Sequence, residues 1–132
     1  MASWLRVLIA LVVAGHGAGY VLFGLLGPRQ VKGWQGSPRL LSISRQRAKA
    51  VATTVHVAAG SLLIACAVAI LVAPSAPGLW RPLAIGAGVV SLCAFATFWD
   101  GQIGKAAEEG ALGLMASLAL LGCAVALPGA FT

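Results

Sequence analysis

Residues 4–26 read WLRVLIALVVAGHGAGYVLFGLL, an apolar run in which Arg6 is the one charged side chain. At about 1.5 Å per residue, a helix of this length can cross a hydrocarbon core of about 30 Å. Three further apolar runs follow, at 51–73, 79–99 and roughly 110–127. Four such runs in 132 residues predict an all-α integral membrane protein, a bundle of four transmembrane helices in one domain.

The composition supports the same class. Hydrophobic residues make up 60% of the chain and charged residues 9%, with a mean hydropathy of +0.96, which is outside the range of a domain with a solvated surface. The runs are continuously apolar, whereas transmembrane strands alternate. The net charge of +6 is therefore interpreted as a signal of orientation in the membrane. The basic residues have no soluble domain on which to form a groove for nucleic acid.

Basic side chains concentrate in the connection 27–50. Because Lys and Arg near span ends favour the cytoplasmic side, this loop is predicted to be cytoplasmic and both termini to lie outside. The expected location is a bacterial cytoplasmic (inner) membrane, crossed several times. The same side chains are predicted to contact anionic lipid headgroups, with a protein partner as the alternative. They are Arg29, Lys32, Arg39, Arg45, Arg47 and Lys49.

All acidic residues, Asp100, Glu108 and Glu109, fall between the third and fourth runs. The predicted topology places them on the same side of the membrane as the basic connection. Ion pairs between the two loops would hold them together, and each exposed pair would contribute about 0–1 kcal/mol. We expect Asp100 and Glu108 to cap the fourth helix or to neutralise Arg45 and Arg47, rather than to act in catalysis.

Turn chemistry predicts where the helices stop and start. Breaks are expected at Gly27-Pro28, at 74–78 and at Asp100-Gly101. The second helix is expected to begin early, within 40–47, with Ser42 or Ser44 as its N-cap. Pairs of small residues four apart predict close helix packing in every span. These pairs are Gly15 and Gly19, Ala65 and Ala69, Ala84 and Gly88, and Gly113 and Ser117.

Two histidines lie inside the apolar runs, His16 in the first and His56 in the second. Ionisable residues at such depth are costly, so each is a candidate functional residue. Tyr20 shares a helix face with His16, and Thr53 shares one with His56. Since the two helices run antiparallel, all four side chains are predicted to face one cavity that binds a hydrophobic or quinone-like ligand.

Other interpretations of the histidines remain open. His16 could hydrogen-bond Tyr20 or a carbonyl, and His56 could bond Thr53 or Ser61, with no ligand at all. Two imidazoles on neighbouring helices could instead ligate haem b. Two histidines alone are too few for a stable metal site, so none is predicted.

The sequence offers little catalytic chemistry. Cys66, Cys93 and Cys123 lie one per run without a CxxC pair, and a Cys66–Cys123 disulfide stays open as an alternative to three buried thiols. No nucleophile and base pair, phosphate loop or paired carboxylates stand out, so no catalytic residue is assigned and an enzyme is the less favoured interpretation.

Short elements carry a resemblance to a known family. FWDGQIG at 98–104, leading through Glu109-Gly110 into the last run, together with His16-Gly17 and LFG at 22–24, resembles the small four-helix bacterial membrane proteins grouped as DoxX-like. The resemblance covers the whole chain in span number and length, and it implies a membrane subunit of a quinone-linked sulfur or redox system. Members of that family often have a basic residue after the glycine of the first span, whereas this chain has Tyr20 there. The resemblance therefore implies mainly the four-helix architecture, and an activity less directly.

Three functions follow as hypotheses. The first is a bundle that binds a hydrophobic or quinone-like ligand, as a redox-associated accessory subunit. The second is a structural or assembly subunit that packs against a membrane protein partner or a second copy. The third is an oligomeric transporter. It has the least support, because the apolar runs contain no acidic residue and no pair of broken helices.

Overall fold

The computed structural model describes residues 2–30, 44–75, 78–98, 111–127 and 131. They form four helices, α1 (Ser3–Gln30), α2 (Arg45–Leu71), α3 (Trp80–Phe98) and α4 (Ala111–Ala126), and the described residues contain no strand. The all-helical prediction is confirmed. The helices α1, α2 and α3 are long and apolar enough to cross a membrane, whereas α4, with 16 residues, is a shorter apolar helix.

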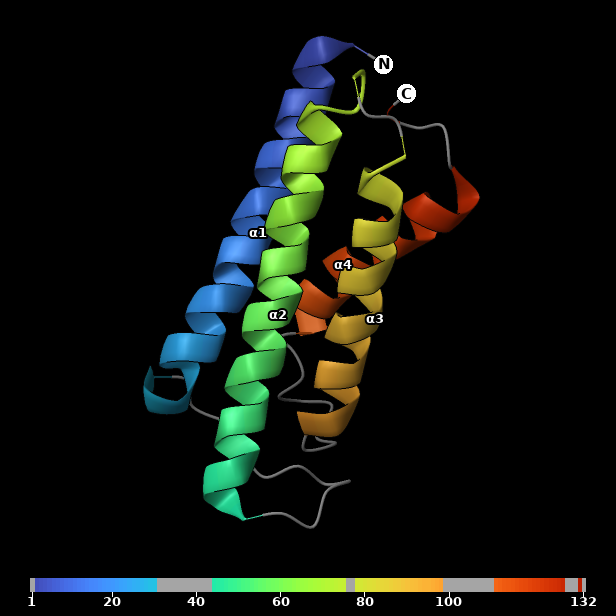
Figure 1. Cartoon of the computed structure of the whole chain (residues 1–132). Helices are drawn as coiled ribbons and strands as arrows, with labels where there is room; N and C mark the ends of the chain where they lie inside the picture. The colour runs from blue at the N-terminus through green and yellow to red at the C-terminus, as the bar shows by residue number, and fades with distance from the viewer. Residues whose placement is uncertain (1, 31–43, 76–77, 99–110, 128–130, 132) are drawn as a thin grey trace.

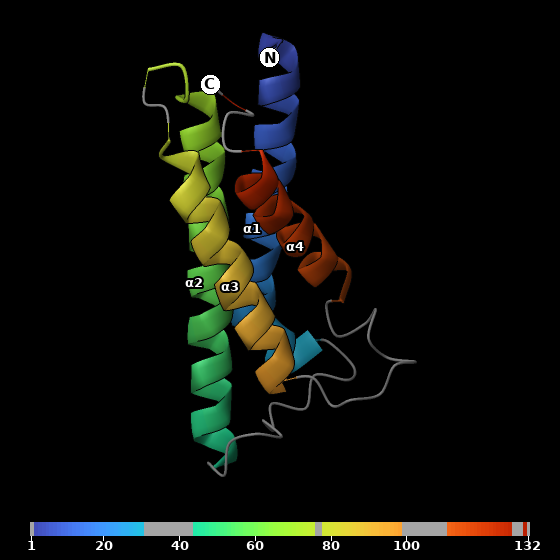
Figure 2. The ribbon, with the colours of Figure 1, turned by 90° about the vertical axis from the view of Figure 1, so that its right-hand side faces the viewer.

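The helices pack in chain order. α2 lies between α1 and α3, α3 packs against α4, and α4 makes a small contact with α1. The start of α1 and the end of α4 lie at one end of the bundle, and the end of α1 and the start of α2 lie at the other (Figure 1). α4 crosses α3 at an angle and begins near the mid-height of the bundle (Figure 2). We call the end at which α2 starts the basic end, because Arg47 and Lys49 are exposed there.

Local hydrogen bonds fix two helix ends. The hydroxyl of Ser44 accepts a hydrogen bond from the backbone N–H of Arg47 at 3.4 Å, which confirms Ser44 as the N-cap of α2. At the opposite end of the bundle, Nε of Arg81 donates to the carbonyl of Ala124 at 2.9 Å. This bond satisfies a carbonyl in the last turn of α4 and places a cation at the negative end of its dipole. It also ties the start of α3 to the end of α4.

The predicted break at Gly27-Pro28 is wrong, because α1 continues to Gln30. Proline has no N–H, so Pro28 leaves the carbonyl of Gly24, four residues earlier, without its intrahelical donor. The hydroxyl of Thr53 on α2 donates to that carbonyl at 3.0 Å. A hydroxyl from a neighbouring helix is a usual way for an apolar helix to tolerate proline, and here it lets α1 pass through.

Close packing of α1 on α2 depends on two facing glycines. A Cβ added at Gly17 would lie 2.8 Å from the carbonyl oxygen of Gly60, and one added at Gly60 would lie 2.5 Å from that of Gly17. The predicted contact pair was Gly15 and Gly19, which is wrong, since a Cβ at either glycine would meet nothing within 4 Å among the described residues. The helix α1 is therefore rotated so that Gly17 faces α2.

The other small-residue pairs vary. Ala84 and Gly88 are buried, as a close-packing pair requires, and a Cβ at Gly88 would lie 2.8 Å from Cβ of Leu121, so the helix that approaches here is α4. On α2, Ala69 is buried, whereas Ala65 is exposed.

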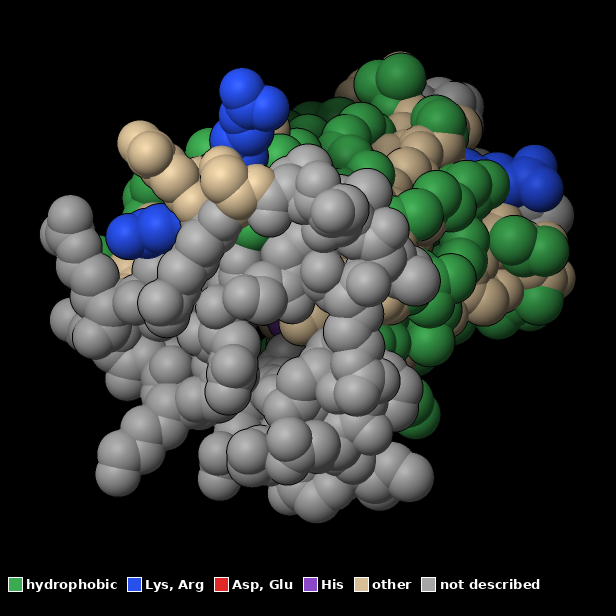
Figure 3. Space-filling view, turned by 90° about the horizontal axis from the view of Figure 1, so that it is seen from below, with side chains coloured by type: hydrophobic (Ala, Val, Ile, Leu, Met, Phe, Trp, Pro, Cys, Tyr) green, Lys and Arg blue, Asp and Glu red, His purple; other side chains and the backbone are tan. Residues whose placement is uncertain are grey.

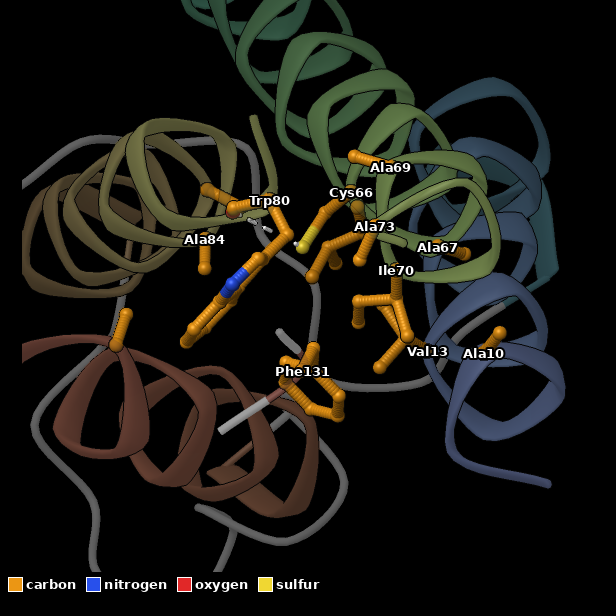
Figure 4. Close-up of a cluster of buried hydrophobic side chains, with 13 residues drawn as sticks. Ala10, Val13, Cys66, Ala67, Ala69, Ile70, Ala73, Trp80, Ala84 and Phe131 are labelled. Carbon is orange, nitrogen blue, oxygen red and sulfur yellow. Dashed lines mark hydrogen bonds between the residues drawn. The ribbon is translucent and has the colours of Figure 1, made fainter. Parts of the chain in front are cut away.

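The main core lies at the end of the bundle opposite the basic end, around Trp80 (Figure 4). Trp80 is 0% exposed and meets the ring of Phe131 edge to face, with centroids 4.7 Å apart. Sγ of Cys66 donates to the carbonyl of Trp80 at 3.5 Å, and Ile70 is fully buried beside it. All three cysteines are free, so the alternative of a Cys66–Cys123 disulfide is not seen.

Much of the outward surface of the helices is apolar. Leu112 on α4 is 75% exposed and Trp4 on α1 is 68% exposed, and large aliphatic side chains on all four helices are also exposed. A helix that is apolar all round is typical of a protein interior or a membrane span. The outward faces of this bundle therefore have the chemistry of surfaces that contact lipid.

Candidate functional site

The site begins at His16, halfway along α1. Its Nε2 lies 3.1 Å from Oγ of Ser117, a fully buried residue of α4. A Cβ at Gly113, one turn earlier in α4, would lie 3.1 Å from Cε1 of His16 and 3.4 Å from Cε2 of Tyr20. Gly113 thus lets the α4 backbone approach both rings.

The Tyr20 ring connects the two histidines. It meets His16 edge to face, with centroids 5.1 Å apart, and stacks on His56, with centroids 5.9 Å apart and planes at 30°. His56 also contacts Phe23 of α1 at 5.1 Å and Phe98 of α3 at 6.4 Å between centroids. We call these five side chains the aromatic cluster. It brings together rings from α1, α2 and α3, with α4 closing one side at Ser117.

The protonation of His56 is set by its own helix. Nδ1 lies 2.7 Å from the carbonyl oxygen of Ala52, and His56 makes this bond rather than one to Thr53 or Ser61. Because a carbonyl can only accept a hydrogen bond, Nδ1 carries the proton and donates. In the neutral ring, Nε2 is then an acceptor. Among the described residues, none forms a hydrogen bond with Nε2.

Three of the four predicted ligand-binding residues come together. His16, Tyr20 and His56 form the centre of the aromatic cluster. Thr53 lies on the same interface, but its hydroxyl is used by the carbonyl of Gly24. Its observed role is therefore to hold α1 and α2 together.

Ser117 and Phe98 were not predicted as site residues. Ser117 was identified only as a packing residue, although it is the one hydroxyl-bearing residue in α4. A buried hydroxyl in an otherwise apolar helix requires a hydrogen-bond partner, and that signal could have linked it to a histidine. Nothing in the sequence around Phe98 indicates its contact with His56, which depends on how α3 packs.

Thr53→Val is expected to lower the free energy of unfolding by about 1–3 kcal/mol, because it leaves the Gly24 carbonyl without a donor in an apolar interior. Unfolding by SDS in mixed micelles, followed by circular dichroism, measures the change. Thr54→Val is the matched control, since Thr54 is exposed on the same helix. Equal losses at both positions would show that the Gly24 bond contributes nothing.

The cluster does not fit a haem with two histidine ligands. Such a macrocycle lies between its two axial imidazoles. Here the Tyr20 ring lies between His16 and His56, against both of them. Nε2 of His16 is already bonded to Ser117. Among the described residues, no three His, Cys, Asp or Glu side chains are grouped as a metal site would require.

Part of the basic end is described. Arg47 and Lys49 are exposed at the start of α2. For Arg29 and Arg45 the structure describes the helical backbone alone, and Lys32, Arg39, Asp100, Glu108 and Glu109 lie outside the described residues. Seen from this end, Lys and Arg side chains lie at the edge of the molecule, and a histidine side chain is visible between other residues (Figure 3).

The aromatic cluster is mostly apolar. It combines several rings with few polar atoms, and two of its residues are imidazoles, which can donate or accept a proton. No family model, curated protein or solved structure matches the chain.

Proposed function

We propose that this chain is an integral protein of a bacterial inner membrane that binds a hydrophobic, quinone-like ligand at the aromatic cluster. The observation that carries the proposal is the connection of His16 to His56 through the Tyr20 ring, with Ser117 as a further polar group. Polar groups this deep in apolar helices are costly, and they are kept chiefly where they serve a function.

The composition of the cluster suits a flat, apolar molecule. Sites for such ligands are lined by aromatic and aliphatic side chains with a few polar groups that fix orientation. Phe23 and Phe98 supply apolar ring surface next to His56, and aromatic pairs of this kind gain about 0.5–1.5 kcal/mol beyond burial. Nε2 of His56 and the His16–Ser117 pair are the polar groups.

The membrane topology is part of the proposal. The apolar outward faces support insertion, and the excess of Lys and Arg in 27–50 supports a cytoplasmic basic end. Since α1 starts and α4 ends at the opposite end of the bundle, both termini would lie outside. The six basic residues of the connection would then contact anionic headgroups of the inner leaflet.

The redox-associated role has a separate basis. It rests on the resemblance to DoxX-like proteins, through which we infer an accessory subunit rather than an enzyme. Quinone is accordingly the cofactor that we propose, and the haem alternative is set aside on the geometry of Tyr20.

A structural or assembly subunit is the second candidate, and one observation favours it. Gly15 and Gly19 lie one turn apart on α1, and a Cβ at either would have no neighbour within 4 Å in the part of the chain that the structure describes. Small residues at this spacing let a second helix approach closely in a membrane. A membrane protein partner or a second copy of this chain could occupy that face.

His16→Leu is expected to reduce retention of the native ligand at least about tenfold, because it removes the polar link between α1 and Ser117. The measurement is mass spectrometry of small molecules extracted from the detergent-purified protein. Thr54→Leu, on an exposed face of α2, is the control and should retain the ligand.

Two outcomes would count against ligand binding. The first is an identical small-molecule profile for wild type and His16→Leu. The second is a wild-type protein that carries no small molecule but co-purifies with a stoichiometric membrane protein, which would favour the structural subunit.

A further inference from the structure

The backbone of α2 determines which nitrogen of His56 carries the proton. Nδ1 of His56 donates its proton to the carbonyl of Ala52 at 2.7 Å. This bond determines which of the two neutral forms of the imidazole is present, and it leaves a lone pair at Nε2. A molecule that meets Nε2 must therefore bring a hydrogen-bond donor.

The neighbours of His56 in the cluster do not supply that donor. Tyr20 meets the imidazole ring to ring, with planes at 30°, and not through its hydroxyl. Phe23 and Phe98 have no polar atom, and they contact the same imidazole. The polar atom that His56 can offer to a ligand is thus Nε2, a hydrogen-bond acceptor in the neutral ring.

We propose that the ligand of the aromatic cluster presents a hydroxyl to Nε2 of His56, and that the site selects a phenol or quinol over a quinone or ether. This inference rests on the proposed function and names its ligand class. A quinone carbonyl and an ether oxygen only accept hydrogen bonds, so neither can pair with an acceptor at Nε2. A phenolic hydroxyl pairs with Nε2 while its ring contacts the surrounding rings.

The other polar pair of the site does not impose this choice. Ser117 carries a hydroxyl, which can donate or accept, and its bond to Nε2 of His16 works in either sense. His16 also has a backbone hydrogen bond to Gly113, so both of its partners lie on α4, whereas the backbone partner of His56 lies on its own helix. We assign the preference for a ligand that donates a hydrogen bond to His56.

Matched probes test the selection on the full-length, detergent-purified protein. One pair is 4-nonylphenol and its methyl ether, which differ in a single hydrogen-bond donor. The second pair is decylbenzoquinol and decylbenzoquinone, compared without oxygen. Dissociation constants from calorimetry are expected to favour the phenol and the quinol at least about tenfold.

A variant of His56 isolates the cause. His56→Phe keeps a ring in place and removes the acceptor, so the preference between phenol and ether is expected to vanish. His16→Phe is the matched control, and it should keep the preference even if both probes bind more weakly. Loss of the preference in His16→Phe alone would overturn the assignment to His56.

A measurement on the unliganded protein tests the premise without any probe. The chain has two histidines, so a ¹⁵N-histidine NMR spectrum shows two imidazoles, and His16→Gln assigns them. His56 is expected to carry its proton on Nδ1 and a lone pair on Nε2. A proton on Nε2 of neutral His56 would overturn the inference.

The outcomes separate this inference from the proposed function. Equal binding within both pairs, or tighter binding of the quinone and ether, would overturn the inference and leave a ligand site in place. Failure of all four probes to bind at micellar saturation would overturn both.

Discussion

Trp80→Ala is expected to lower the free energy of unfolding by about 3–5 kcal/mol, the largest loss from any single substitution considered. Trp80 is 0% exposed and packs edge to face on Phe131, beside Cys66 and Ile70. Removing the indole leaves a cavity at the point where α2, α3 and the chain end meet, and the lining atoms lose their dispersion contacts. SDS titration in mixed micelles, followed by circular dichroism, measures the loss.

Two variants control the Trp80 experiment. Trp4→Ala removes the same side chain from an outward face, where Trp4 is 68% exposed, and should change stability by less than about 0.5 kcal/mol. Trp80→Phe should cost less than half as much as Trp80→Ala. The reason is that Nε1 of Trp80 is buried without a hydrogen-bond partner among the described residues, so the phenyl ring also removes an unpaired donor. A loss at Trp4 equal to that at Trp80 would contradict the position of the core.

Gly60→Ala is expected to destabilise the protein by about 1–3 kcal/mol, although it adds one methyl group and a better helix former. The new Cβ would lie 2.5 Å from the Gly17 carbonyl oxygen and 2.9 Å from the backbone nitrogen of Val21. Backbone atoms cannot yield as a flexible side chain can, so α1 and α2 must move apart. The displacement would also strain the contact between Tyr20 and His56, which face each other across the same interface.

Gly19→Ala is the matched control for Gly60→Ala. A Cβ at Gly19 meets no described residue within 4 Å, so the change should leave stability unaltered or raise it by about 1 kcal/mol through helix propensity. The same SDS titration measures both variants. If Gly19→Ala were destabilising and Gly60→Ala neutral, the rotation of α1 described above would be wrong.

Helix positions could be predicted from the sequence because a long apolar run determines both the type and the length of its element. The runs 51–73 and 79–99 correspond to α2 and α3 within a few residues, apart from the basic first turns of α2. The end of α1 could not be predicted in this way. Pro28 is a local stop signal, but the group that overrides it, the Thr53 hydroxyl, is 29 residues away from Gly24 in the chain.

The rotation of α1 could not be predicted either. Gly15 and Gly19 lie on one face of α1 and Gly17 on nearly the opposite one, and small residues on either face offer a close helix contact. Which one is used depends on the partner helix, where Gly60 is the position that accepts a close crossing. A pattern on one helix does not contain this information.

The candidate site was partly predictable. His16, Tyr20 and His56 are conspicuous because they are polar or titratable in apolar helices, and periodicity places them on facing sides. Ser117 and Phe98 join them through the crossing of α4 and the packing of α3, which periodicity does not determine. The part of the site carried by one helix pair was therefore predictable, and the part added by the other two was not.

The chain-order packing of the helices has a consequence for biogenesis. Each helix packs mainly against the one synthesised just before it, so a growing chain finds every partner already made. The hydrogen bond between His16 and Ser117 joins the first helix to the last and forms only when α4 arrives. The five rings of the aromatic cluster are thus made before α4, and a growing chain that has not yet produced α4 would hold both histidines without the contact to Ser117.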